Sequence, residues 1–350
     1  MGSGRPAPDQ PDVGRALLAH LRRTLGRSDL DWAEPPRRIT GGFDTAIYGF
    51  RLAGAPDAFG GPLVLRLFRA EASTAHARFE GAVHTAVAAL GYPAPRVLST
   101  SEPGGELGRA FLLLERVPGR RMLDPLLHPR TLRAPELLAD AQARLHALDA
   151  GVFERALEAE GFGTGRLGLE AELAELGAGI ECFSLGGLRE GLRWLAERRP
   201  RTPERLSICH GDFHPLNVLV AGGRVSGVVD WARARVCPPD YDVGITVALL
   251  RLGPVHLPGA LAPAVELGRR ALVAAYLRAY ARRRALDEDA VRYFEALRCL
   301  VILLEASEHR LADAGAIPRP SKPTAFGGPR AVARVVARFH ALTGVRATPP

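Results

Sequence analysis

The sequence has almost no lysine. Of its 46 basic residues only Lys322 is a lysine, and the other 45 are arginines. The formal net charge is +8, but no dense basic run is interleaved with aromatic residues, which make up 6% of the chain. A nucleic-acid partner is therefore not indicated. Any phosphate-binding role for a basic side chain in the N-terminal half must fall to an arginine, whose planar fork of donors suits phosphate.

Cysteine is scarce as well, and long hydrophobic runs are missing. The four cysteines are widely separated and form no C-x-x-C pair, which argues against a zinc site or a disulfide framework and fits a reducing compartment. The longest apolar run near the C-terminus, residues 299–304, is far below the ~20 residues that span a bilayer. The first residues contain no apolar secretion signal. We expect a cytoplasmic protein without a membrane partner, and the oligomeric state stays open.

The most informative segment is residues 208–231, ICHGDFHPLNVLVAGGRVSGVVDW. Phosphoryl transfer to a hydroxyl needs a carboxylate that orients the hydroxyl and oxygen ligands for magnesium. Asp212 and Asn217 are five residues apart, as are the corresponding carboxylate and amide of a kinase catalytic loop. Cys209 lies in a predicted buried strand just before Asp212. We interpret Cys209 as a small core residue, because neighbouring strand residues point to opposite faces.

A hairpin is predicted between Asn217 and Asp230. Two short apolar stretches, residues 218–220 and 225–229, flank a turn at residues 221–224 whose two glycines can adopt positive φ. The far end of such a hairpin returns Asp230 near Asn217. A carboxylate and an amide oxygen could then share one hard cation.

HGDFHPLN followed by VVDW resembles the aminoglycoside phosphotransferase and choline kinase-like family, relatives of the protein kinases. The resemblance implies an α+β fold of two lobes, with a small N-terminal antiparallel sheet and a larger, mainly helical C-terminal lobe. It implies that Asp212 is the catalytic base or hydroxyl-orienting residue and that Asn217 and Asp230 bind Mg²⁺. The structural alternative is that these three residues cap a turn, close an Asx-turn and end a strand.

The sequence upstream fits the nucleotide-binding lobe of that family. Residues 39–52 read as two short strands around Gly41 and Gly42, which resemble the family's loop over the phosphates but could be an ordinary turn. The buried-strand pattern of residues 62–68 contains Arg66 where the family carries a basic residue for the phosphates. The alternative for Arg66 is a surface position on the strand face.

A helix is predicted over residues 72–90, because apolar residues recur there at helical spacing. Glu80 resembles the helix glutamate that pairs with the phosphate-binding base, so Arg66 and Glu80 form a candidate ion pair; the alternative is a solvated helix residue. The strand that ends in Pro-Gly near residue 118 looks like the family's hinge. Backbone groups of Glu115 and Val117 would hold adenine there.

Length and composition allow two lobes of ordinary size, since the chain has 350 residues of which 47% are hydrophobic. We assign residues 1–118 to the nucleotide-binding lobe and residues 119–350 to the catalytic and substrate-binding lobe. Helical periodicity is strong in residues 135–148, 265–284 and 289–312, and Pro329 opens a last helix. Residues 163–168 match G-x-G-x-x-G, but no strand precedes them, so a dinucleotide-binding loop is not indicated.

Several residues have supporting or open roles. His210 is interpreted as structural, with a second proton carrier as the alternative, and His214 matches the family without a role that we can derive. Asp242 matches a family aspartate that braces the catalytic loop, although Cys237-Pro238-Pro239 precedes it where relatives often have Gly-Asp-Pro. Acidic residues could recognise a cationic acceptor or be solvated helix faces; these are Glu170, Glu172, Glu175, Glu305 and Glu308.

Together these features favour an ATP- and Mg²⁺-dependent kinase that phosphorylates a hydroxyl of a small molecule, such as an antibiotic or secondary metabolite. GTP stays open as the donor, and so does the acceptor, because the family's acceptors are diverse. The alternative is a nucleotide-binding regulatory pseudokinase module without transfer activity. A protein kinase is disfavoured, since the chain has no H-R-D, D-F-G or A-P-E string.

Overall fold

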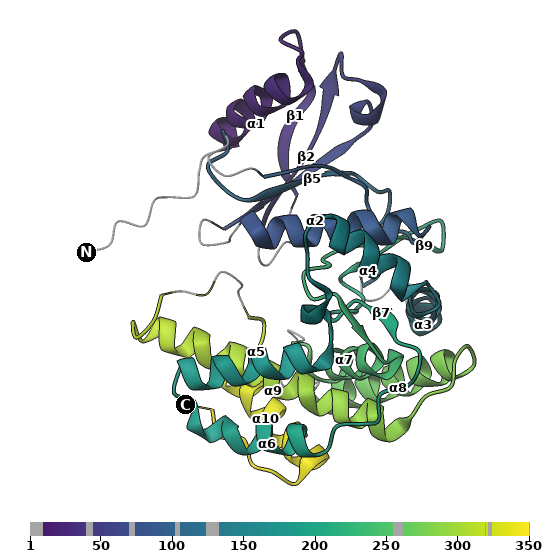
Figure 1. Cartoon of the computed structure of the whole chain (residues 1–350), viewed down its shortest axis with the longest axis vertical. Coiled ribbons are helices and arrows are strands. Elements are labelled where there is room, and N and C mark those ends of the chain that lie inside the picture. The colour runs from purple at the N-terminus through teal and green to yellow at the C-terminus, as the bar shows by residue number, and fades with distance from the viewer. Residues whose placement is uncertain are drawn as a thin grey trace. The chain divides into compact units, whose positions relative to one another are not determined.

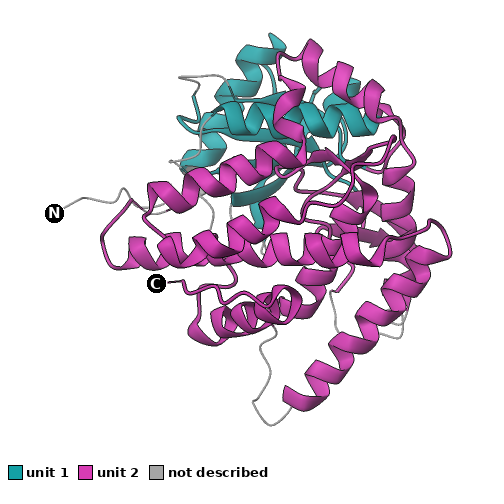
Figure 2. Cartoon of the chain, turned by 60° about the horizontal axis from the view of Figure 1, so that its bottom comes forward, with its two compact units in different colours: residues 1–88, 94–117 teal, residues 89–93, 118–350 magenta. Residues whose placement is uncertain are grey.

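A computed structural model describes residues 10–39, 45–69, 74–101, 106–123, 133–254, 262–318, 320 and 324–349 (Figure 1). The chain divides into two compact units. The N-terminal unit consists of residues 1–88 and 94–117, and the C-terminal unit consists of residues 89–93 and 118–350 (Figure 2).

The N-terminal unit is built on one antiparallel sheet of five strands in the order β1-β2-β3-β5-β4. The strands are β1 (Asp31–Ile39), β2 (Thr45–Ala53), β3 (Leu63–Phe68), β4 (Val97–Thr100) and β5 (Phe111–Glu115). Successive residues of β5 point to opposite faces. Phe111 and Leu113 join the apolar cluster that includes helix α1 (Gln10–Leu25), whereas Leu112 and Leu114 pack with Ala77 of helix α2 (Thr74–Ala89). The two helices therefore cover opposite faces of the sheet.

Strand β1 differs from the sequence prediction. It lies almost wholly upstream of residues 39–52, where the first strand was expected. Its sequence, DWAEPPRRI, contains two prolines, which normally argue against a strand. β1 is an edge strand whose pairing with β2 is interrupted between Trp32 and Glu34 and again between Glu34 and Arg37. Proline is tolerated at such positions because its missing N–H faces solvent or an irregularity.

The predicted catalytic hairpin is present in the C-terminal unit. Strands β8 (Val218–Ala221) and β9 (Arg224–Val228) pair antiparallel, and β6 (Arg120–Arg121) pairs with the other edge of β8. Gly222 and Gly223 both have positive φ, 56° and 77°, the geometry of a two-residue type I′ turn. Strands β7 (Ser207–Cys209) and β10 (Arg235–Cys237) form a second short pair. They carry the two ends of the segment that contains the site.

The rest of the C-terminal unit is mainly helical (Figure 1). Its helices are α3 (Ala134–His146), α4 (Ala150–Ala159), α5 (Leu169–Cys182), α6 (Arg189–Glu197), α7 (Pro239–Leu252), α8 (Ala262–Ala281), α9 (Glu288–Asp313) and α10 (Pro329–Thr343). The side chain of Asp287 caps α9 by accepting from the N–H groups of Asp289 and Ala290. α10 begins at Pro329 and ends at Gly344, which has φ of 75°. Helices α5, α6, α7, α9 and α10 contribute to one large apolar core.

Two further expectations can be compared with the fold. The G-x-G-x-x-G segment follows helix α4 and contains a short 3₁₀ turn, Thr164–Leu167. Because a helix and not a strand precedes it, the segment is not a dinucleotide-binding loop. Within the described ranges, no helix is both long and apolar enough to cross a membrane.

Candidate active site

The loop that carries Asp212 follows strand β7, and its backbone turns sharply at Gly211. Gly211 has φ of 74°, in the left-handed region that glycine adopts without steric cost. A Cβ atom at this position would lie 2.2 Å from the carbonyl oxygen of Arg233. Only glycine fits there, so the shape of the loop requires the glycine that precedes Asp212.

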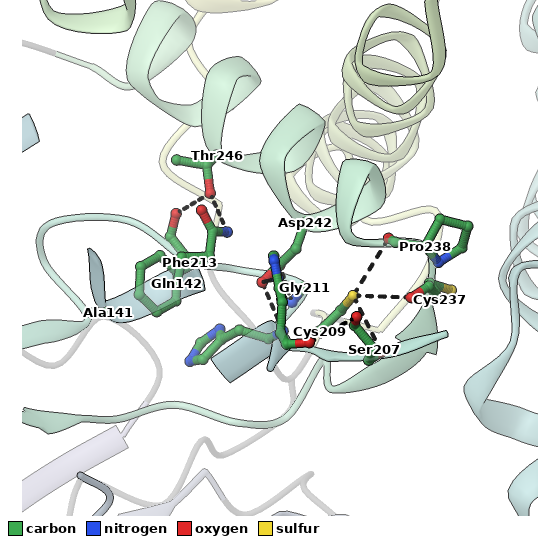
Figure 3. A network of polar contacts seen from close by, with 12 residues as sticks. Ala141, Gln142, Ser207, Cys209, Gly211, Phe213, Cys237, Pro238, Asp242 and Thr246 are labelled. Carbon is green, nitrogen blue, oxygen red and sulfur yellow. Dashed lines mark hydrogen bonds and ion pairs between the residues drawn. The ribbon is translucent and has the colours of Figure 1, made fainter. Parts of the chain in front are cut away.

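Asp242, in the first turn of α7, braces this loop (Figure 3). Its Oδ1 accepts a hydrogen bond from the N–H of Gly211 at 2.8 Å, and its Oδ2 accepts one from the N–H of His210 at 3.0 Å. His146 Nε2 lies 3.2 Å from the same Oδ2. Burial alone would raise the pKa of Asp242, but the hydrogen bond and charge interaction with His146 outweigh it and lower the pKa. The bracing contacts implied by the family resemblance are therefore present, and the Cys-Pro-Pro departure upstream leaves them intact.

His210 is fully buried and ties the catalytic loop to the end of the hairpin. Its Nδ1 accepts a hydrogen bond from the N–H of Asp212 at 3.2 Å, so Nε2 carries the proton and donates to the carbonyl of Val229 at 3.0 Å. Burial lowers the pKa of His210, which favours this neutral form. Both ring nitrogens are occupied by the backbone, as expected for a structural residue rather than a proton carrier.

A second chain of hydrogen bonds holds the other end of the loop (Figure 3). Thr246 Oγ1 donates to the carbonyl of Phe213 at 2.8 Å and accepts from Gln142 Nε2 at 3.0 Å. The hydroxyl of Tyr276 donates to Gln142 Oε1. Asp242 and Thr246 are four residues apart on α7 and so lie on one face. A single rigid helix thus fixes the loop on both sides of Asp212.

The carboxylate of Asp212 is partly exposed and meets three side chains. Arg298 Nη2 donates to its Oδ1 at 3.0 Å, while Asn217 Nδ2 and His214 Nε2 lie 3.4 Å and 3.5 Å from its Oδ2. Burial would raise the pKa of Asp212, but the charges of His214, Arg298 and Arg233 together hold the pKa well below its usual range. The carboxylate is ionised at neutral pH, which is the form that can accept a hydrogen bond from a hydroxyl.

Asn217 and Asp230 are brought to the same end of the hairpin. The N–H of Val229 donates to the carbonyl of Asn217 at 3.0 Å, one residue before Asp230. The amide nitrogen of the Asn217 side chain donates to the backbone carbonyl of Asp212 at 3.0 Å. The side-chain oxygen of Asn217 therefore points away from that carbonyl. Asp230 has φ of 70°, an uncommon conformation for a residue other than glycine and one often found at functional sites.

This donor set fits Mg²⁺. A carboxylate and an amide oxygen are hard ligands, and magnesium is usually held by one or two carboxylates together with the phosphates of a substrate. Among the residues that the structure describes, no group of three or more His, Cys, Asp or Glu side chains could hold a metal. A site completed by nucleotide phosphates does not require such a group.

In the N-terminal unit, Arg66 on β3 and Glu80 on α2 form the predicted ion pair. Arg66 Nη1 donates to Glu80 Oε1, and Arg66 Nε donates to Thr45 Oγ1 at 3.3 Å. The exposed fraction is 9% for Arg66 and 0% for Glu80. The alternatives of a surface arginine and a solvated glutamate are therefore wrong. Binding of phosphates by Arg66 stays a prediction.

The remaining nucleotide-site predictions are constrained to different degrees. The N–H of Glu115 donates to the carbonyl of Arg96 at 3.0 Å, so only the carbonyl of Glu115 could contact adenine. Val117 is the last residue of the N-terminal unit. Gly41 and Gly42 lie outside the described residues.

Four of the five acidic residues considered for a cationic acceptor are already engaged within the chain. Three of them pair closely with arginines: Glu170 with Arg199, Glu175 with Arg235 at 2.6 Å, and Glu305 with Arg233. The fourth, Glu172, accepts a hydrogen bond from the hydroxyl of Tyr241 at 2.6 Å. Burial and the neighbouring charge of Glu305 raise the pKa of the fifth, Glu308, to about 7. Arginines thus pair closely with three of these five carboxylates, and Glu172 is buried.

Sequence reasoning missed the contact between Arg298 and Asp212 and the relay through Thr246, Gln142 and Tyr276. Arg298 did leave a signal: it stands within the apolar stretch of α9, beside Leu297 and the run of residues 299–304. A charged residue in a buried helix face is almost never left unpaired. Its partner could not be named from the sequence, because 86 residues separate it from Asp212.

Comparison with known proteins identifies the family of the chain. Residues 37–294, well over half of the chain, match the phosphotransferase enzyme family, and the chain belongs to that family. An aminoglycoside 3′-phosphotransferase of Niallia circulans is 27% identical over 211 residues, which cover 58% of this chain and 70% of that protein. The family assignment confirms the prediction of a small-molecule kinase.

Two solved structures show the same fold. A thermostable mutant of aminoglycoside phosphotransferase APH(4)-Ia, in ternary complex with ADP and hygromycin B, superposes with a TM-score of 0.56 at 17% identity, covering 95% of this chain and 99% of that chain. Macrolide 2′-phosphotransferase MphH from Brachybacterium faecium superposes with a TM-score of 0.53 at 23% identity, covering 88% and 99%. The predicted kinase-like α+β fold is confirmed.

Proposed function

We propose that the protein is an ATP- and Mg²⁺-dependent O-phosphotransferase that acts on a hydroxyl of a small-molecule antibiotic or related metabolite. The observation that carries this proposal is the loop of residues 210–217. Asp212 is ionised there, Asn217 is hydrogen-bonded to it, and α7 fixes the backbone on both sides. A turn that only closes the backbone would hold its carboxylate against backbone N–H groups, whereas the Asp212 carboxylate is partly exposed and meets the side chains of Arg298, Asn217 and His214.

In the proposed reaction, Asp212 accepts a hydrogen bond from the acceptor hydroxyl and orients its oxygen toward the γ-phosphorus of ATP. The new oxygen–phosphorus bond forms as the bond to the β,γ-bridging oxygen breaks, ADP leaves, and the hydroxyl proton passes to Asp212. Asn217 and Asp230 would hold Mg²⁺, which supplies charge neutralisation at the phosphates when bound. Arg66, oriented by Glu80, would bind the phosphates, and the backbone of Glu115 and Val117 would hold adenine.

The relatives support a small-molecule acceptor but do not single one out. The names of the two solved relatives refer to an aminoglycoside and a macrolide phosphotransferase, and one of those structures contains hygromycin B. We infer a hydroxyl-bearing antibiotic of a class still to be found by screening. We also infer a cytoplasmic location, because ATP, the proposed donor, is made there.

The deciding experiment measures ADP release with ATP or GTP as donor across aminoglycosides, macrolides, peptide antibiotics, choline-like alcohols and sugars. We expect one class to stimulate release, and Asp212→Asn to lower kcat at least ~100-fold, a loss typical of a removed general base. Magnesium-dependent ATP binding without release for any acceptor would favour the regulatory pseudokinase instead. Near-normal turnover in Asp212→Asn would remove Asp212 from the mechanism.

A further inference from the structure

We propose that Arg298 is a positioning residue that fixes the orientation of the Asp212 carboxylate and thereby selects which of its two oxygens meets the acceptor. This inference rests on the proposed phosphotransferase function. It assigns a role to a residue of α9, outside the segment of residues 208–231 that carries the catalytic motifs.

The contact is specific in its geometry. Arg298 Nη2 donates to Oδ1 of Asp212 at 3.0 Å. Among the described residues, Oδ2 has only longer contacts, 3.4 Å to Asn217 Nδ2 and 3.5 Å to His214 Nε2. A charge-assisted hydrogen bond to one oxygen resists rotation of the carboxylate about its bond to Cβ. Oδ1 is therefore the anchored oxygen, and Oδ2 is the one left to accept the hydrogen bond of a hydroxyl.

Arg298 is itself held from the other side. Its Nη1 lies 3.8 Å from Oε1 of Glu305, and Arg233 Nη2 also donates to that oxygen. Glu305 is seven residues further along α9, so it lies on the same face of the helix as Arg298. The charges alternate in the order Asp212, Arg298, Glu305, Arg233. The carboxylate of Glu305 thus offsets the repulsion between the two arginines and holds the Arg298 guanidinium beside the loop.

The burial of Arg298 is costly for the fold. Its side chain is 7% exposed, and its Nε–H has no acceptor within the described part of the chain. A buried donor without a partner is normally selected against, because its desolvation is not compensated. An apolar residue would fill this position of α9 with a lower desolvation cost. The presence of an arginine at this position is explained if its contact with Asp212 serves the reaction.

The test is a double-mutant cycle in which the rate of phosphate transfer from γ-labelled ATP is measured for the whole chain. The variants are Arg298→Gln, Asp212→Asn and the combination of both. We expect Arg298→Gln to lower kcat by about 10- to 100-fold, since a small misplacement of a reacting group costs that much, while the Kd for ATP stays within twofold of that of the unaltered protein. Because Arg298 acts through Asp212, the double variant should be no slower than Asp212→Asn alone.

A purely structural role would give a different pattern, with losses that multiply in the double variant. The matched control is Arg338→Gln. Arg338 lies on α10 and pairs with the carboxylate of Glu295 on α9, the helix that carries Arg298. The kcat of this control at low temperature should be unchanged even if its Tm falls. Multiplicative losses, or equal losses of kcat in Arg298→Gln and in this control, would overturn the proposal.

Two further variants keep the test decisive if Arg298→Gln does not fold. Arg298→Lys retains the charge and should recover part of the lost kcat. Arg298→Ala should be accelerated by guanidinium chloride at millimolar concentration, far below the range that unfolds proteins, and not by the same concentration of urea. Absence of both forms of rescue would contradict the assignment.

The failure of this inference can be told apart from the failure of the proposed function. If the unaltered chain transfers phosphate to no acceptor, the proposed function itself is wrong. If the unaltered chain is active, Asp212→Asn is inactive and Arg298→Gln is fully active, only the role of Arg298 is refuted.

Discussion

Oδ1 of Asp242 accepts a hydrogen bond of 2.8 Å from the backbone N–H of Gly211. The bond links the first turn of α7 to the one residue of the catalytic loop that must be glycine. The loop can reach this carboxylate only because Gly211 has positive φ and no side chain. The conformation of the loop and the helix that braces it therefore depend on each other.

The first prediction concerns Gly211→Ala. The new Cβ would meet the carbonyl oxygen of Arg233 at 2.2 Å in addition to the strain of positive φ. We expect the free energy of unfolding to fall by about 2–4 kcal/mol and transfer activity to be lost. Urea unfolding and kcat measure the two effects.

The control for this variant is Gly222→Ala in the hairpin turn. Gly222 also has positive φ, 56°, but no atom of the described residues lies within 4 Å of its added Cβ. It should lose only the ~1 kcal/mol associated with positive φ and keep most of its activity. Equal losses in both alanine variants would mean that the contact with Arg233 is unimportant.

The second prediction concerns Asp242→Asn. An asparagine offers one oxygen, whereas the carboxylate accepts from the N–H groups of Gly211 and His210 with separate oxygens. One buried amide would then lose its acceptor, at a cost of about 1–3 kcal/mol, and kcat should fall because the loop is no longer fixed. Asp240→Asn removes a carboxylate from the same helical turn without touching the loop. A similar fall of kcat in that variant would contradict the bracing role.

The sequence predicted the parts of the site that depend on local spacing. Asp212 and Asn217 lie on one loop, and Asp230 follows a hairpin with a two-residue turn. The separation of these residues along the chain therefore nearly determines how they are arranged. Arg298 and Thr246 could not be assigned, because their contacts depend on how α9 and α7 pack against the loop. Strand β1 was missed for a related reason. Its prolines are acceptable only at a sheet edge, and the position of a strand in its sheet is a tertiary property.

The third prediction concerns the ion pair of the N-terminal unit. Arg66→Lys keeps the positive charge but replaces the planar fork that reaches both Glu80 and Thr45. We expect the Kd for ATP, measured by calorimetry, to rise about tenfold, which corresponds to ~1.4 kcal/mol, with a smaller change in kcat. Arg51→Lys, on the exposed side of β2 and 3.8 Å from Glu34, is the control and should bind ATP normally. Unchanged ATP affinity in Arg66→Lys would separate the pair from nucleotide binding.

The fourth prediction concerns pH and stability. Burial and then the charge of Glu305 raise the pKa of Glu308 to about 7, against the opposing effect of Arg233, whereas an unfolded glutamate has a pKa of about 4.3. Between these values the folded chain binds more protons than the unfolded chain. The contribution of Glu308 to stability is therefore greatest below pH 4 and is lost as the pH rises through 7.

Glu308→Gln removes this dependence, because glutamine stays neutral. At pH 8 the variant should be more stable than the unaltered chain by about 1–2 kcal/mol, after allowance for solvent at a half-buried group, and at pH 5 the difference should be small. Urea unfolding at the two pH values measures it. Glu288→Gln removes the same charge from an exposed position of α9 and tests whether any lost carboxylate has this effect. If Glu308→Gln is no more stable than the unaltered chain at pH 8, the carboxyl group of Glu308 is not held in its protonated form by its surroundings, and the burial argument for this position is wrong.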